Sequence, residues 1–218
     1  YCGNAPVIVR EFVEGLTFAP ESYFYAVATH GGHAVAANPQ IASILNRKGF
    51  MRYKLYELEM VHNGAFIAPV PSNDEIRYVL DAAYQRADAI GRELRMNPVE
   101  PLPIADSILE KIASNPMAKK IVLSFDPGRM ASDYFLDKAC THCGTCVQVC
   151  PMGNIRLEEN GPHWGERCQL CMACLQWCTA GAIQYVHNHI PNHTTVGKKR
   201  YRNPDVRLSE LLLKRADI

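Results

Sequence analysis

Long apolar runs are absent from this 218-residue sequence, and neither sign of charge is in excess. No stretch approaches the ~18–20 consecutive apolar residues that a membrane-spanning helix needs, so we expect no membrane span. The 23 Lys and Arg residues nearly balance the 22 Asp and Glu residues, which leaves a formal net charge of +1. That balance gives no whole-chain argument for nucleic acid or an anionic membrane as a partner.

Cysteine is missing from residues 3–139, although the chain contains nine. Eight of them lie between Cys140 and Cys178, and the ninth is Cys2. Their spacing is not that of a disulfide-stapled secreted protein. Thiolates that bind a metal need a reducing compartment, so we expect a cytoplasmic protein. Cys2 stands apart from the others and is predicted to be a spare thiol.

The sequence also lacks an initiator Met, a phosphate-binding loop and a nucleophile elbow. The scattered Ser, His and Asp residues therefore give no argument for a hydrolase or a kinase. Proline and glycine mark the first elements instead. Pro6 suits the first position of a helix, and the spacing predicts one apolar helix face with Ile8, Phe12 and Leu16.

Helix and strand signals then alternate. The apolar run at 22–29 predicts a strand buried on both faces, and the alternating pattern at 53–61 predicts a second strand nearer a sheet edge. Between them we expect a helix with Asn38 as its N-cap and Gly49 as its stop.

A longer helix is predicted after Pro71, where Ser72 and Glu75 have the spacing of a capping box. Its apolar face would comprise Ile76, Val79, Leu80, Ala83, Ala87, Ile90 and Leu94. This order of elements implies a parallel α/β sheet with helices on both faces. Because the chain starts on a helix, we expect the C-terminal part of a doubly wound sheet; the alternative is a small irregular α/β domain.

The strongest signal is a duplicated cysteine motif. The two copies read "CTHCGTCVQVCP" and "CQLCMACLQWCT" and lie 28 positions apart. The match continues beyond the cysteines, since Gly153 pairs with Gly181 and Ile155 with Ile183. The two copies therefore indicate an internal duplication.

Three closely spaced thiolates on one loop can bind three corners of a [4Fe–4S] cluster, while the fourth cysteine ligates the other cluster. We call the two predicted ligand groups the first and second cysteine sets. The first cysteine set is Cys140, Cys143, Cys146 and Cys178. The second cysteine set is Cys168, Cys171, Cys174 and Cys150. Zinc is the competing interpretation, because it also binds paired C-x-x-C motifs.

On these motifs, residues 137–189 resemble a bacterial two-cluster ferredoxin, and the whole chain resembles the flavodoxin–ferredoxin fusion proteins of anaerobic bacteria. The resemblance implies an α/β plus α+β fold with four parts. These are an N-terminally incomplete flavodoxin-like domain (1–95), a linker with a short helix (96–135), a 2[4Fe–4S] ferredoxin domain (136–189) and a basic tail with a short helix (190–218). The second motif departs from the family, since Thr179 stands where Pro usually follows the fourth cysteine.

The resemblance also implies FMN in the intact parent protein, although this sequence lacks the family's phosphate loop. It maps two loops that flank a flavin onto "YCGN" at residues 1–4 and "THGGH" at residues 29–33. His30, Gly31 and Gly32 are thus the candidate flavin contacts, since glycines permit close approach of the backbone to a flat ligand.

Weaker signals lie around the motif. A metal is one interpretation of His187, His189 and His193, and solvated loop histidines are the other. The basic and aromatic run at 198–202 predicts a solvated or partner-docking face rather than a nucleic-acid site. Trp177 is predicted to shield the cluster of the second cysteine set, and Trp164 to lie in a surface insertion.

These observations favour an iron–sulfur electron carrier that exchanges electrons with a redox partner protein or a flavin, without catalytic residues of its own. A flavin-dependent reductase with the clusters as an internal wire is the alternative. A third interpretation is a module in which the clusters are structural or sense oxygen.

Overall fold

Two compact units make up the chain. The structure is a computed structural model, and it describes residues 4–32, 36–96, 128–187 and 192–212. The first unit comprises Tyr1–Val61 and Pro71–Phe125, and the second comprises His62–Val70 and Asp126–Ile218. The predicted short helix of the linker, Cys2 and His189 lie outside the described residues.

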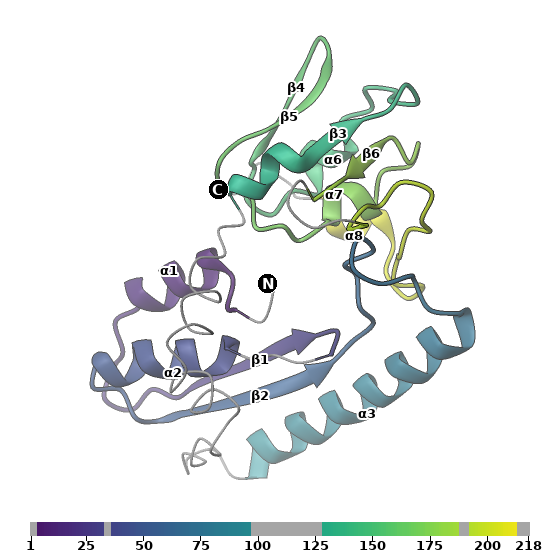
Figure 1. The fold of residues 1–218 in the computed structure, drawn as a ribbon. Coiled ribbons are helices and arrows are strands. Elements are labelled where there is room, and N and C mark those ends of the chain that lie inside the picture. The colour runs from purple at the N-terminus through teal and green to yellow at the C-terminus, as the bar shows by residue number, and fades with distance from the viewer. Residues whose placement is uncertain (1–3, 33–35, 97–127, 188–191, 213–218) are drawn as a thin grey trace. The chain divides into compact units, whose positions relative to one another are not determined.

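A parallel pair of strands forms the centre of the first unit. Strands β1 (Phe24–His30) and β2 (Tyr53–Glu59) pair from their first residues to their last. Helices α1 (Val7–Gly15) and α2 (Ala37–Arg47) lie on one side of the pair, and α3 (Asn73–Met96) on the other (Figure 1). The predicted parallel pair between helices is confirmed. No larger parallel sheet is present among the described residues, and the flavodoxin-like assignment stays a prediction.

The core of this unit lies between α1, α2 and the strands. Half-buried Phe18 packs against this core and stacks on the buried Phe50, with ring centroids 4.0 Å apart. The predicted apolar face of the first helix is wrong, because Ile8 is 39% exposed and Phe12 is 63% exposed. Helix α1 turns Val13 inward instead. The buried cluster consists of Ala5, Val13, Ile41, Ala42, Ile44, Leu45, Phe50 and Tyr53.

The prediction that the first strand is buried on both faces is also wrong. Tyr25 is 59% exposed and Val27 is 42% exposed, and the strand alternates between half-buried and exposed residues. Helix α3 packs against β2, so among the described residues the Tyr25 side of β1 has little cover. A continuous apolar run therefore does not show how many layers cover a strand.

The helix ends largely follow the sequence signals. Gly49, with φ of +69°, ends α2, and the amides of Gly49 and Phe50 close the last turn on Asn46 and Leu45. The predicted N-cap is wrong: α2 begins at Ala37, and the Asn38 side chain donates to the carbonyl of Tyr56 on β2.

The duplication is visible in the elements of the second unit (Figure 1). Helices α6 (Thr145–Gln148) and α7 (Ala173–Gln176) occupy the same place in the two repeats. Four strands flank them, namely β3 (Tyr134–Leu136), β4 (Ile155–Glu158), β5 (Gly161–Trp164) and β6 (Ile183–Tyr185). The 3₁₀ helix η1 (Arg129–Asp133) precedes them, and α8 (Leu208–Leu211) lies in the tail, where a short helix was predicted.

The strands pair across the two repeats. The antiparallel pairs are β3 with β6 and β4 with β5. Thus the strand that leads into each repeat pairs with the strand that leaves the other repeat. The pairing joins the two copies into one unit.

The segment His62–Val70 belongs to this second unit, although the sequence grouped it with residues 1–95. Gln176 donates to the Asn63 carbonyl at 2.6 Å, and Lys198 donates to the Phe66 carbonyl at 3.3 Å. The Phe66 ring lies 4.9 Å from that of Tyr185. The segment is therefore part of the packing of the cysteine-rich unit.

Candidate metal centre

Left-handed backbone positions recur at equivalent places in the two cysteine loops. His142 (φ 55°) corresponds to Leu170 (φ 51°), and Gly144 (φ 74°) corresponds to Met172 (φ 61°). Residues other than glycine rarely adopt this conformation, because the Cβ crowds the following carbonyl. These turns reverse the chain between successive cysteines in both loops.

The second cysteine set surrounds a cavity. All four members line it, namely Cys150, Cys168, Cys171 and Cys174. Cys150 comes from the first repeat, whereas the other three come from the second. The structure thus brings together the four residues that the crossed assignment groups; their binding of a cluster stays a prediction.

Burial opposes ionisation of these thiols. It raises the pKa of Cys168 to about 11, and it also raises the pKa of Cys171 and of Cys174. Two backbone amides partly offset this by donating to sulfur at 3.3 Å, from Asn154 to Cys150 and from Leu170 to Cys168. Because metal ligands must be thiolates, a bound metal would supply the charge that stabilises them here.

Aromatic side chains form one wall of the cavity. Tyr134 stacks on Trp164, with ring centroids 5.2 Å apart and planes 7° apart, and its hydroxyl donates to the Met172 sulfur at 3.2 Å. The indole N–H of Trp164 is enclosed without a geometrically complete hydrogen bond, yet it lies near enough to Cys174 to lower the pKa of that thiol against the effect of burial. An unused donor beside four thiols fits a sulfur-rich cluster.

The structure therefore corrects the roles of the two tryptophans. Trp164 was expected in a surface insertion; it lies on β5 and lines the cavity. Trp177 was expected to shield this site, but it does not line the cavity, and the Arg202 guanidinium lies 5.9 Å from its ring. The role of Trp164 follows from its stacking on Tyr134 of β3 and its place in the cavity wall, which no local pattern signals.

The first cysteine set is more open. Cys143 is exposed, and the Thr145 hydroxyl 3.3 Å from its sulfur lowers the pKa of the thiol to about 7. Cys146 is buried, which raises its pKa to about 11, and the nearby Cys178 and Cys143 thiols add to the increase. At least three members of this set thus lie close enough to interact.

The basic run Lys198–Arg202, which we call the clasp segment, lies over the second repeat. Arg202 donates to the carbonyls of Gln176 and Cys178 at 2.8 Å each, and the Tyr201 amide donates to the Gln176 side chain at 2.7 Å. Arg200 donates to the Ile183 carbonyl at 2.6 Å. The prediction of a solvated face is wrong for Arg200, whose Nη1 is buried, whereas Arg202 binds two carbonyls of this unit and is exposed.

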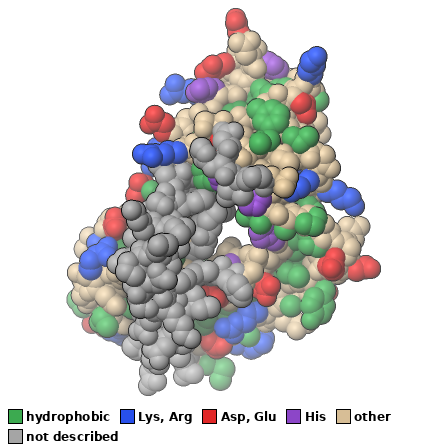
Figure 2. Space-filling model, viewed as in Figure 1, with side chains coloured by type: hydrophobic (Ala, Val, Ile, Leu, Met, Phe, Trp, Pro, Cys, Tyr) green, Lys and Arg blue, Asp and Glu red, His purple; other side chains and the backbone are tan. Residues whose placement is uncertain are grey.

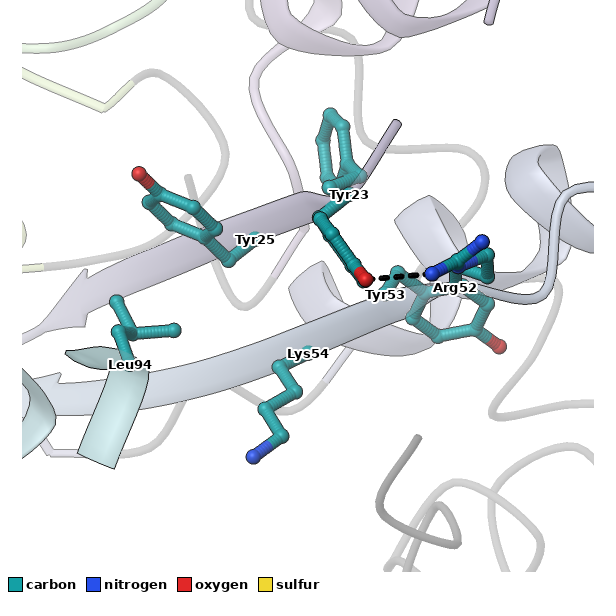
Figure 3. Close-up of a pocket in the computed structure, with 7 residues that line it drawn as sticks. Tyr23, Tyr25, Arg52, Tyr53, Lys54 and Leu94 are labelled. Carbon is teal, nitrogen blue, oxygen red and sulfur yellow. Dashed lines mark hydrogen bonds between the residues drawn. The ribbon is translucent and has the colours of Figure 1, made fainter. Parts of the chain in front are cut away.

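The candidate flavin contacts are not among the residues that line the cavity of the second cysteine set or the pocket in Figure 3. That pocket lies at the amino ends of β1 and β2, where Arg52 donates to the Tyr23 hydroxyl. His30 ends β1 at the opposite side, and Gly31 and Gly32 follow it. FMN stays a prediction.

The predicted histidine group is only partly brought together. The rings of His187 and His193 lie 6.2 Å apart, and His187 lies 4.0 Å from the Asp133 carboxylate. Among the residues that the structure describes, no three His, Cys, Asp or Glu side chains surround one point closely enough to hold a single metal ion, so the second cysteine set is grouped by the cavity that it lines. None of the described helices is long and apolar enough to span a membrane. Basic and acidic side chains are interspersed over the described surface in view in Figure 2.

Comparison with known proteins assigns the class of the site. Residues 139–183 match the family model described as the 4Fe-4S dicluster domain. The chain therefore contains a ferredoxin-type iron–sulfur domain, and the match supports 4Fe-4S clusters at these cysteines.

Similar proteins include several ferredoxin-type relatives. The ferredoxin-like protein in the nif region of Nostoc sp. is 40% identical over 42 residues, which are 19% of this chain and 35% of that protein. The methylamine utilization ferredoxin-type protein MauM of Paracoccus denitrificans is 36% identical over 69 residues, with 26% of this chain and 30% of that protein covered.

A third relative carries a different name. The DNA-directed RNA polymerase subunit Rpo3 of Methanosarcina mazei is 43% identical over 49 residues, which are 21% of this chain and 18% of that protein. The chain thus spans about a third or less of the length of these relatives. Together, the domain and the ferredoxin-type relatives support an iron–sulfur electron carrier.

Proposed function

We propose that this chain carries single electrons on two [4Fe–4S] clusters, each bound by one cysteine set. The observation that carries the proposal is the cavity of the second cysteine set, where Cys150 of one repeat joins three cysteines of the other. The compact spacing of three cysteines on each loop, with the fourth from the other repeat, suits two [4Fe–4S] clusters better than zinc sites. Each cluster, when bound, supplies one-electron redox chemistry.

The protein's own part is to hold and shield the metal. Left-handed turns lie between the cysteines of both loops, and the strands pair across the repeats, which supports a fourth ligand from the other repeat. Tyr134 and Trp164 stack beside the second cysteine set, and backbone amides donate to its sulfurs. Burial, charge and such hydrogen bonds set the potential of a cluster.

A redox partner protein is the proposed source or acceptor of the electrons. The ferredoxin-type names of the relatives support it. The parallel strands between helices support a flavodoxin-like first unit, and with it a flavin as the other exchange partner. A cytoplasmic location is proposed because the thiolates need a reducing compartment.

Anaerobic reconstitution tests the proposal. We expect about eight irons and eight sulfides per chain, and an EPR signal after reduction. A chain loaded with zinc and silent in EPR would refute it.

The crossed ligation is tested by a matched pair of variants. Cys178→Ser removes a ligand of the first cysteine set, although it lies in the second repeat, and should abolish the cluster of Cys140, Cys143 and Cys146 while leaving the other largely intact. Cys150→Ser should do the reverse. If each variant instead loses the cluster of its own repeat, the ligation is not crossed.

A further inference from the structure

The two cysteine sets lie in unlike surroundings. The second cysteine set is enclosed by Tyr134, Trp164 and Met172, and no Lys or Arg side chain lines its cavity among the described residues. The first cysteine set has an exposed member, Cys143, with the Thr145 hydroxyl beside it. A net charge is stabilised less in an apolar enclosure than beside water and hydroxyl groups.

Arg200 adds a fixed positive charge beside the first cysteine set. Its Nη2 donates to the Gly181 carbonyl at 3.1 Å and to the Ile183 carbonyl at 2.6 Å. The Gly181 amide in turn donates to the Cys178 carbonyl at 3.1 Å. These bonds hold the guanidinium in the turn that follows Cys178, where it interacts electrostatically with the Cys178 thiol.

One nitrogen of this guanidinium has no hydrogen-bond partner among the described residues. Its Nη1 is buried and makes no hydrogen bond with any described residue. Burial lowers the pKa of Arg200. The guanidinium nevertheless stays charged at physiological pH. A buried cationic donor without an acceptor beside a cluster ligand suits an anionic group that binds there.

We propose that Arg200 is a positioning residue that raises the reduction potential of the cluster held by the first cysteine set, so that this cluster is reduced before the other. The inference rests on the proposed function. Reduction adds one electron to the cluster and makes it more negative by one unit, with no proton or bond exchanged. A nearby positive charge stabilises the reduced state more than the oxidised state, and the effect falls with distance.

A difference in reduction potential between the two clusters would favour electron transfer in one direction within the unit. Electrons that enter at the enclosed second site would pass to the first site, whose Cys143 is exposed to a partner. The clasp segment is then a part of the redox machinery, although it follows the last cysteine by about twenty residues of sequence.

An anaerobic redox titration of the full-length protein, followed by EPR, tests the proposal. Arg200→Gln should lower one of the two midpoint potentials, by an amount equivalent to a three- to tenfold change in the equilibrium constant, where tenfold corresponds to about 59 mV for one electron. The potential that shifts should be the one that disappears in Cys178→Ser. Arg200→Lys, which keeps the charge, should stay near the wild type.

Matched control variants distinguish the position of the positive charge from the net charge of the protein. Lys199→Gln removes the same charge from an exposed neighbour and should leave both potentials unchanged. Asp137→Asn removes a negative charge that interacts with Arg200 and should shift the same potential upward. Asp137→Asn also keeps the proposal falsifiable if Arg200→Gln fails to fold.

Several results would overturn the inference. These are equal shifts of both potentials, no shift in Arg200→Gln or Asp137→Asn, or a shift confined to the potential that survives in Cys178→Ser. Iron and sulfide are counted in each variant. A wild-type protein without clusters would refute the proposed function itself, whereas a loaded protein with unmoved potentials would refute only the role of Arg200.

Discussion

Thr195 links a strand of the cysteine-rich unit to the clasp segment. Its side chain is almost fully buried, with 1% exposed. The hydroxyl accepts a hydrogen bond from the Tyr185 amide at 2.8 Å and donates to the Gln184 side chain at 3.1 Å. The same Gln184 oxygen accepts from Arg200 at 3.0 Å. One hydroxyl thus supports both β6 and the position of Arg200.

Removing that hydroxyl should destabilise the second unit. Thr195→Val keeps the shape but removes the acceptor of a buried amide, which costs about 1–3 kcal/mol. We expect a lower urea midpoint for loss of the cluster absorbance. Thr195→Ser keeps the hydroxyl and should lose less than Thr195→Val; a loss confined to Thr195→Ser would show that the methyl group, and not the hydrogen bonds, stabilises this position.

At this scale the sequence groups the cysteines better than it predicts their surroundings. The eight cysteines could be grouped because their spacing is local and duplicated. Trp164, Arg200 and Thr195 could not be placed, because each acts through residues that meet it only after folding. Arg200 was predicted to be solvated for the same reason. The sequence of a short basic run does not show which carbonyl groups its side chains will bind after folding.

Among the elements, α3 has the best-defined start. The Ser72 hydroxyl accepts from the Glu75 amide at 3.3 Å, and the Glu75 carboxylate accepts from the Ser72 amide at 2.8 Å. This reciprocal pair confirms the predicted capping box. Of the predicted apolar face, Ile76, Leu80, Ala83 and Ile90 are buried, whereas Ala87 is exposed.

We predict that Ser72→Ala loosens the start of α3, with a loss of about 1 kcal/mol as is typical of N-caps. Amide hydrogen exchange in the first turn should quicken in Ser72→Ala, while Ser72→Thr should retain most of the protection. Equal exchange in the alanine variant and the wild type would contradict the role of the cap.

The same pair gives this helix start a pH dependence. The Ser72 hydroxyl and amide lower the pKa of Glu75 below its ordinary value of 4.5. A lowered carboxyl pKa contributes stability that is present above the ordinary value and is lost as the pH falls through the lowered pKa. Protection of the first turn should therefore decline below about pH 4.5 in the wild type and less in Ser72→Ala.

The elements that the sequence misjudged share a physical cause. The pattern of α3 is long and repeats its signal, so one exposed Ala87 does not alter the prediction. Helix α1 has only 9 residues, and several of its faces carry apolar side chains, so the pattern could not select Val13. For β1, the amount of cover depends on where α3 packs, which no local pattern reports.

At the scale of the whole molecule, the second unit is built from two separate segments of the chain. His62–Val70 joins that unit from the middle of the first, long before Asp126. Phe66 is 6% exposed and packs on Tyr185, so this early segment carries part of the core of the iron–sulfur domain. The predicted domain boundary near residue 95 does not describe these contacts.

A pair of phenylalanine variants should separate the stabilities of the two units. Phe66→Ala should destabilise the second unit by about 3–5 kcal/mol and lower the temperature at which cluster absorbance is lost. Phe50→Ala, in the core of the first unit, should leave that temperature nearly unchanged and lower the far-UV CD transition of the helices instead. If Phe50→Ala lowers the cluster transition as much as Phe66→Ala does, the two units do not unfold independently.

The exchange of strands between the repeats has a consequence for their origin. A lone repeat would lack both a partner for its strands and a fourth thiolate, since β3 pairs with β6 and Cys150 lies with the cysteines of the other copy. Two identical chains of one repeat could satisfy both needs by swapping these parts around a twofold axis. The present unit has the form of such a homodimer whose gene was duplicated and fused, after which the copies were free to diverge.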